Sequence, residues 1–137
     1  MYHLDSDICI ELMRGRLPYA YELRRQNDPS LFAIPAIVEA ELRTGAAKSP
    51  HPRKNLALLE RFLAPFSRIP FDSECAATYA TIRSYLEKKG CKIGPNDLLI
   101  AATAVTHGAV LVSNNAREFS RIPTLRLESW TEMDIDE

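Results

Sequence analysis

The sequence predicts an α/β fold in which a mainly parallel sheet is covered by helices on both faces. Short apolar segments typical of strands alternate with helical segments along the chain, the order that builds parallel sheets. The segment 109–112 is apolar on both faces, as a central parallel strand is. The segment 98–105 has no polar face, which predicts a helix buried in the core.

Length and composition bound the class of protein. At 137 residues the chain has the size of one domain, so we expect a single domain over residues 1–137. Its 46% hydrophobic and 26% charged residues are typical of a soluble globular protein, and no apolar run is long enough to span a bilayer. Asp5 and Asp7 stand where an export signal would be basic and apolar. We therefore expect a cytoplasmic protein with no membrane partner.

Charge and cysteine content exclude fewer functions. A net charge of -1 neither indicates nor excludes a nucleic-acid partner, because a local basic surface can surround an acidic centre. The three cysteines show no CxxC spacing, which favours reduced thiols over disulfides or a zinc site. No GxSxG, GxGxxG or GxxxxGK motif is present, so neither a serine-nucleophile turn nor a phosphate-binding glycine loop is indicated.

The first predicted strand ends in an acid. Residues 2–5 alternate like a strand, and Ser6 is the expected N-cap of a helix over residues 7–13. Asp5 then lies at the carboxyl end of the strand, where the active sites of open α/β sheets collect. For Asp7 we favour a simpler role, in which its carboxylate binds N–H groups at the start of the helix.

A second acid lies on a helix predicted over residues 36–48, which follows a helix at 19–26 and a strand at 31–34 and is opened by Pro35. Glu39 has Arg43 four residues later, a spacing that stabilises an exposed helix face. Glu41 lies on an otherwise apolar, small-residue face, so its carboxylate needs a solvent-filled cleft or a cation. We favour a functional role for Glu41.

The middle of the chain carries no candidate site. We predict a helix over 53–63, a strand over 67–71 and a helix over 72–89 that ends at Gly90. Asp72 and Glu74 are interpreted as capping acids. The core side chains expected on the long helix are Ala76, Tyr79, Ala80, Ile82 and Leu86.

A third acid opens the buried helix. Gly94 and Pro95 interrupt the preceding segment, Asn96 is the expected N-cap, and Asp97 falls in the first turn, where a carboxylate interacts favourably with the helix dipole. Taken alone, Asp97 is a capping acid.

Polar residues also follow the strand at 109–112. Asn115 and Glu118 are three residues apart, so on a short helix they share one side and face the same cleft as Asp5. The alternative is a loop of ordinary capping residues. Residues 125–128 alternate like an edge strand, and the tail 134–137 is expected to fray.

Asp5, Glu41 and Asp97, with Glu118 as a fourth candidate, are acids that burial alone does not explain. Carboxylates that converge on one site repel each other, and a divalent cation relieves the repulsion. All-oxygen ligation favours Mg²⁺ or Mn²⁺. Such a site is suited to the hydrolysis of phosphodiester bonds.

Four motifs in sequence order resemble those of the PIN-domain toxins of VapC type, and together they span nearly the whole chain. They are Leu4–Asp7 with Met13–Arg16, Ala40–Gly45, Ile93–Ala102 and Val112–Phe119. The resemblance implies a three-layer α/β/α sandwich with a central, mainly parallel sheet. It also implies a Mg²⁺-dependent or Mn²⁺-dependent endoribonuclease that acts as the toxin of a bacterial toxin–antitoxin pair.

The same resemblance assigns residues to the site. It makes Asp5, Glu41 and Asp97 metal-binding acids and places Glu118 where the family has a second acid. Asn115 falls where many relatives carry Asp, so a second metal is expected to bind weakly or only with RNA present.

Other positions are given supporting roles. Ser6 keeps the hydroxyl of a Thr common in the family, and Asp7 adds a charge where Asn is common. Arg14, Arg43 or Arg117 are candidate contacts to RNA phosphates.

Partners also follow from the resemblance. It implies a homodimer and a cognate antitoxin that lays an apolar segment into a groove near the first helices and reaches the acidic site with a basic side chain. Tyr19, Tyr21 and Leu23 are candidates for that surface, with a core position as the alternative.

Two other functions remain open at this point. One alternative is a protein that acts mainly as an antitoxin-binding co-repressor, with weak or lost catalysis. The other is a PIN nuclease with a different nucleic-acid substrate.

Overall fold

The structure, a computed structural model, describes residues 1–130, with the exception of the side chains of residues 18–21. In chain order the elements are β1 (Tyr2–Leu4), α1 (Ser6–Met13), α2 (Pro18–Gln26), η1 (Pro29–Leu31), β2 (Phe32–Pro35), α3 (Ala36–Lys48), α4 (Pro52–Leu63), β3 (Ser67–Ile69), α5 (Ser73–Lys88), α6 (Pro95–Thr106), β4 (Val110–Val112), α7 (Ala116–Phe119) and β5 (Arg126–Glu128).

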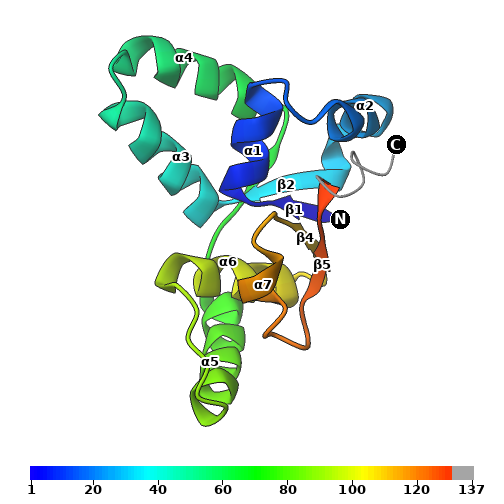
Figure 1. Cartoon of the computed structure of the whole chain (residues 1–137), viewed down its shortest axis with the longest axis vertical. Helices are drawn as coiled ribbons and strands as arrows, with labels where there is room; N and C mark the ends of the chain where they lie inside the picture. The colour runs from blue at the N-terminus through cyan, green and yellow to red at the C-terminus, as the bar shows by residue number, and fades with distance from the viewer. Residues whose placement is uncertain (131–137) are drawn as a thin grey trace.

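Strands β1 to β5 form one parallel sheet in the order β3-β2-β1-β4-β5. Helices α1, α3 and α4 lie on one side of this sheet, and α5 and α6 lie on the other (Figure 1). This confirms the predicted α/β/α fold with its parallel sheet. The strand order reverses between β1 and β4, so the crevice at their carboxyl ends is where this topology places a ligand site.

The core is built from the strands in the middle of the sheet and the helices that cover them. All four residues of β2 are buried, as expected of a strand covered on both faces. Trp130 is fully buried, with its ring centroid 5.8 Å from that of Phe32 and 6.3 Å from that of Tyr2. The last described residue therefore packs against the first two strands.

The starts of α1 and α6 differ from the predicted ones. Asp5 is the N-cap of α1, because its carboxylate accepts the Ser6 N–H and the Ser6 residue is already helical. Gly94 takes the N-cap position of α6, since Pro95 needs no N–H partner at the first helical position. Asn96 therefore lies inside the first turn, which frees its amide for a contact across the site.

Three further predictions have specific outcomes. On α5, Ile82 and Leu86 are buried and Tyr79 packs against the core, as predicted. Ala76 and Ala80 are exposed, and Cys75 is buried although it was not predicted as a core residue. Leu23 is partly buried against the core. The side chains of Tyr19 and Tyr21 and the tail 134–137 lie outside the described residues.

Candidate active site

The centre of the site is the junction of β1 and β4. The Asp5 side chain is only 5% exposed, and its Oδ1 accepts the Ser6 N–H at 2.8 Å while its Oδ2 accepts the Ser113 hydroxyl at 2.8 Å. Ser113 is fully buried and directly follows β4. Burial raises the pKa of Asp5, although the hydrogen bonds from Ser113 and Ser6 act in the opposite direction.

Sequence reasoning did not single out Ser113 as a site residue. The signal was present, because Ser113 is the first polar residue after a fully apolar strand. Its hydroxyl also accepts the Asn115 N–H at 3.0 Å, so one serine fixes both Asp5 and the turn that leads into α7.

Asn115 and Glu118 connect α7 to the start of α6. The Asn115 amide donates to Glu118 Oε2 at 2.7 Å and to Asp97 Oδ2 at 3.4 Å. The other oxygen of Glu118 accepts the Gly94 N–H. A Cβ at Gly94 would lie 3.6 Å from oxygens of both Asp97 and Glu118, so the backbone here passes close to two acids. Asn115 and Glu118 thus face the same site as Asp97.

The pKa values of Asp97 and Glu118, the two acids at this junction, shift in opposite directions. The pKa of Asp97 is raised to about 7 by burial, by its hydrogen bond with Glu118, and by the negative charges of Glu118, Asp5 and Glu41. Burial also acts to raise the pKa of Glu118, but hydrogen bonds from Gly94, Asn115 and Asp97 outweigh it and lower that pKa. Asp97 therefore keeps its proton to a higher pH than Glu118 does, as expected of neighbouring carboxylates without a cation between them.

Glu41 approaches the site from α3. Its Oε1 is buried without a hydrogen-bond partner, and its Oε2 accepts the Asn96 amide only at a long 3.5 Å. A buried carboxylate oxygen with no donor is costly, so this atom lacks the positive partner that its position requires.

These residues fit a hard divalent cation in their chemistry. Within residues 1–130, no three His, Cys, Asp or Glu side chains are gathered closely enough to hold one ion as they stand. The donors are nevertheless carboxylate oxygens, the set that Mg²⁺ and Mn²⁺ prefer. The unpartnered Glu41 oxygen and the repulsion at Asp97 are the two defects that such an ion would remove.

Asp7 has an evident structural role. Its Oδ1 accepts the Ile8 N–H at 2.7 Å, and its Oδ2 accepts the Asn114 N–H at 2.9 Å. It therefore binds a helix N–H, as expected, and in addition ties α1 to the turn after β4. Burial and the charge of Asp5 raise the pKa of Asp7.

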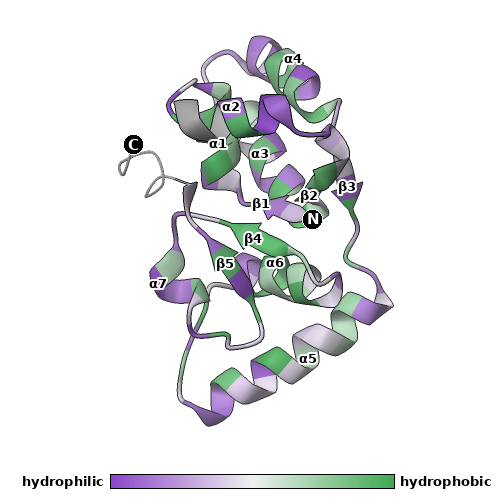
Figure 2. Cartoon of the chain, turned by 90° about the vertical axis from the view of Figure 1, so that its right-hand side faces the viewer, coloured by the Kyte–Doolittle hydropathy of each residue, from purple (hydrophilic) through white to green (hydrophobic). Residues whose placement is uncertain are grey.

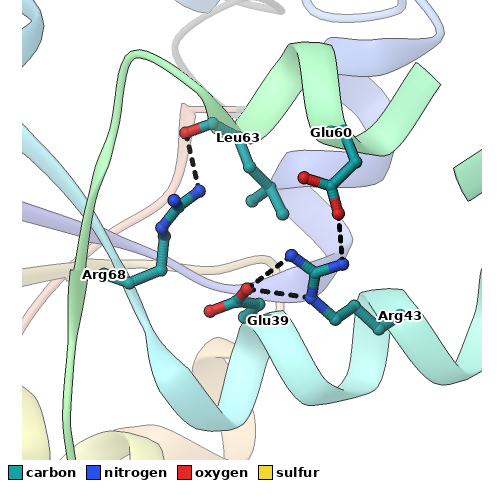
Figure 3. A network of polar contacts seen from close by, with 5 residues as sticks. All are labelled: Glu39, Arg43, Glu60, Leu63 and Arg68. Carbon is teal, nitrogen blue, oxygen red and sulfur yellow. Dashed lines mark hydrogen bonds and ion pairs between the residues drawn. The ribbon is translucent and has the colours of Figure 1, made fainter. Parts of the chain in front are cut away.

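Arg43 is engaged outside the acidic centre. Its guanidinium pairs with Glu39 at 2.9 Å and also binds Glu60 on α4 (Figure 3). A phosphate contact by Arg43 would require both ion pairs to break, whereas Arg117 is exposed on α7. Arg14 lies at the wall of a neighbouring cavity.

This cavity of about 750 Å³ lies between α1, α3 and α4 and reaches the acidic centre at Ser6 and Glu41. Its remaining lining is mostly apolar, and Met13 and Leu58 at its border are 39% and 47% exposed. The lining residues are Ser6, Ile10, Met13, Arg14, Glu41, Leu42, Gly45, Ala46, Ser49, Asn55, Leu58, Leu59, Arg61 and Phe62.

Comparisons with known proteins identify the class to which this fold and site belong. The sequence model described as the PIN domain matches residues 2–125. The chain is 42% identical over 134 residues to the ribonuclease VapC2 of Rickettsia felis, covering 95% of this chain and 98% of the relative. It is 37% identical over 129 residues to the tRNA(fMet)-specific endonuclease VapC of Salmonella typhimurium, covering 94% and 97%.

Solved structures agree with the sequence relatives. The chain matches a structure of DNA-bound VapBC from Salmonella typhimurium with a TM-score of 0.89, at 36% identity, with 94% of this chain and 97% of that chain covered. It matches VapBC2 of Rickettsia felis bound to a promoter DNA fragment with a TM-score of 0.83, at 39% identity, with 94% and 98% covered. No helix in the described part of the chain combines the length and apolarity needed to cross a membrane.

The chain is thus a PIN-domain protein. Within that class it belongs to the family of VapC ribonucleases.

Proposed function

We propose that this protein is a Mg²⁺-dependent or Mn²⁺-dependent endoribonuclease that acts as the toxin of a cytoplasmic toxin–antitoxin pair. Two observations near the β1–β4 switch point support the proposal. The charges of Asp5 and Glu41 act on Asp97, whose pKa is raised to about 7, and Glu41 Oε1 is buried without a partner. Relatives named as ribonucleases support the same reaction class.

In this proposal Asp5, Glu41 and Asp97 hold the ion. When bound, the ion lowers the pKa of a water and stabilises negative charge on a phosphodiester. Ser113 keeps the Asp5 carboxylate oriented, and the Asn115 amide holds Asp97 and Glu118 at a fixed separation. Ser6 supports Asp5 through its N–H, and Arg14 and Arg117 are the free candidates for phosphate contacts.

The cavity between α1, α3 and α4 is where we propose that the antitoxin binds. Its apolar walls suit the apolar face of a helix, and Glu41 in its lining suits a basic side chain of the same partner. Neighbours solved as VapBC complexes support an antitoxin partner. A homodimer is proposed from the family resemblance.

The decisive experiment compares wild type with Asp97→Asn. Both proteins are expressed in bacterial cells and new RNA 5′ ends are mapped; the purified proteins are also incubated with initiator tRNA, with EDTA, Mg²⁺ or Mn²⁺. We expect discrete cuts by the wild type that need a divalent ion and are absent from the variant. Equal cutting by both proteins, or no cutting by either, would refute the proposal.

A further inference from the structure

The charges of the chain are unevenly distributed. Residues 1–130 contain 17 basic and 14 acidic side chains, although the net charge of the full chain is -1. Two short segments, 88–94 and 116–121, carry five basic residues and one acid, Glu118. The five are Lys88, Lys89, Lys92, Arg117 and Arg121, all of them exposed, and we call this set the basic rim.

The two segments of the basic rim meet beside Asp97. The Arg121 guanidinium donates to the Lys92 carbonyl at 2.6 Å, and the Gly94 N–H donates to Glu118. These two contacts join the α5–α6 connection to α7, at the point where Gly94 approaches the Asp97 carboxylate. Figure 2 shows α7 and the end of α5 on the same side of the molecule, and Figure 1 shows α4 at the opposite end.

None of the five basic side chains of the rim forms an ion pair within the described residues. No ion pair within the described part of the chain involves Lys88, Lys92 or Arg117, and the ammonium of Lys89 lies 5.8 Å from the centre of the Tyr85 ring. By contrast, Arg16, Arg25, Arg43 and Arg83 each form an ion pair with a glutamate.

We propose that the basic rim binds the sugar–phosphate backbone of the RNA on one side of the scissile bond. This inference rests on the proposed function. An acidic centre repels the phosphates it must receive, and an adjacent surface of exposed lysines and arginines offsets that repulsion and sets the register of the strand. The contacts are to backbone phosphates, so the rim positions the RNA without reading its sequence.

The test measures RNA binding in a background that cannot cut. In an Asp97→Asn chain, Lys89→Gln and Lys92→Gln are introduced together, and the affinity for initiator tRNA is measured at several salt concentrations. The matched control is Arg53→Gln with Lys54→Gln, two adjacent bases at the start of α4 that remove the same charge far from the rim. Circular dichroism and thermal unfolding verify that all chains fold.

At about 50 mM salt we expect the rim variant to bind at least about 16-fold more weakly than the unsubstituted chain. We expect its salt dependence, the slope of log K against log salt, to fall by about 2, or about 1 for each lysine. The affinity gap to the unsubstituted chain then narrows about 16-fold between about 50 and 200 mM salt. With Asp97 restored, KM rises and kcat changes less than about twofold.

Three results would overturn the inference. They are an unchanged salt slope, an equal loss in the control, and equally tight binding of an acidic peptide at the rim. Failure of the proposed function has a different signature, because wild type would then cut no RNA even if the rim binds it.

Discussion

The pKa of Asp97 makes a quantitative prediction about stability. Burial and the charges of Glu118, Asp5 and Glu41 make the ionised form of Asp97 unfavourable in the folded protein. Asp97→Asn removes this unfavourable charge at high pH. The pKa of Asp97 rises from 3.8 to about 7 on folding, so the native state binds this proton more tightly than the unfolded state does. The contribution of Asp97 to the free energy of unfolding is therefore complete below about pH 4 and is lost as the pH rises through about 7.

The magnitude follows from the size of the shift. About three pKa units correspond to about 4 kcal/mol. Asp97 is only partly buried, so solvent screening reduces the expected effect to about 1–2 kcal/mol. With a urea m value of about 2 kcal/mol/M, the variant should unfold about 0.5–1 M urea higher than wild type at pH 8.

The assay is urea unfolding in EDTA at pH 5 and pH 8, followed by the fluorescence of the single tryptophan, Trp130. The increase in the urea midpoint of the variant over wild type should be small at pH 5 and should reach its full size at pH 8. Adding Mg²⁺ or Mn²⁺ should stabilise wild type and not the variant, because a bound ion replaces the proton. A variant that is less stable than wild type at pH 8 without metal would refute the reasoning.

Three further predictions concern the support of the site and its neighbouring cavity. Ser113→Ala leaves Asp5 Oδ2 buried without its donor, so RNA cleavage should fall about 10–100-fold and unfolding free energy by about 1–3 kcal/mol; unchanged cleavage kinetics would contradict the role of Ser113. Arg43→Gln breaks a largely exposed bridge between α3 and α4, so denaturant unfolding should shift by less than about 1 kcal/mol, and cleavage should stay within about twofold; a large rise in KM would restore Arg43 as a phosphate contact. Leu58→Asp places a charge at the border of the apolar cavity, so calorimetry should show antitoxin binding weakened about 10-fold or more while cleavage of RNA persists; equal affinity would place the antitoxin elsewhere.

The sequence predicted the parts of the site that depend on local pattern. Asp5 at a strand end and Asp97 in the first turn of an apolar helix are both visible as breaks in hydrophobic runs. The sequence also indicates that Glu41 has no local partner, because it lies on a helix face of small and apolar residues. In the structure its Oε1 is buried without a hydrogen-bond partner.

What escaped prediction depends on contacts between distant segments. Ser113 matters because β4 lies beside β1, and Gly94 matters because α7 supplies Glu118 to its N–H. The sequence makes Arg43 a candidate phosphate contact, and only the fold brings its second partner, Glu60 on the next helix, against it. Asn96 is predicted as the N-cap from its own preference for that position, but Pro95 favours the first helical position and moves the N-cap to Gly94.

The hydrogen bond between Asp5 and Ser113 also has a consequence for biosynthesis. Its two residues are 108 positions apart, and β1 can pair with β4 only after the chain has been translated past Val112. The buried setting of Asp5 therefore requires a strand that is synthesised long after Asp5 itself. A nascent chain that ends before β4 therefore lacks the hydrogen bond that orients the Asp5 carboxylate.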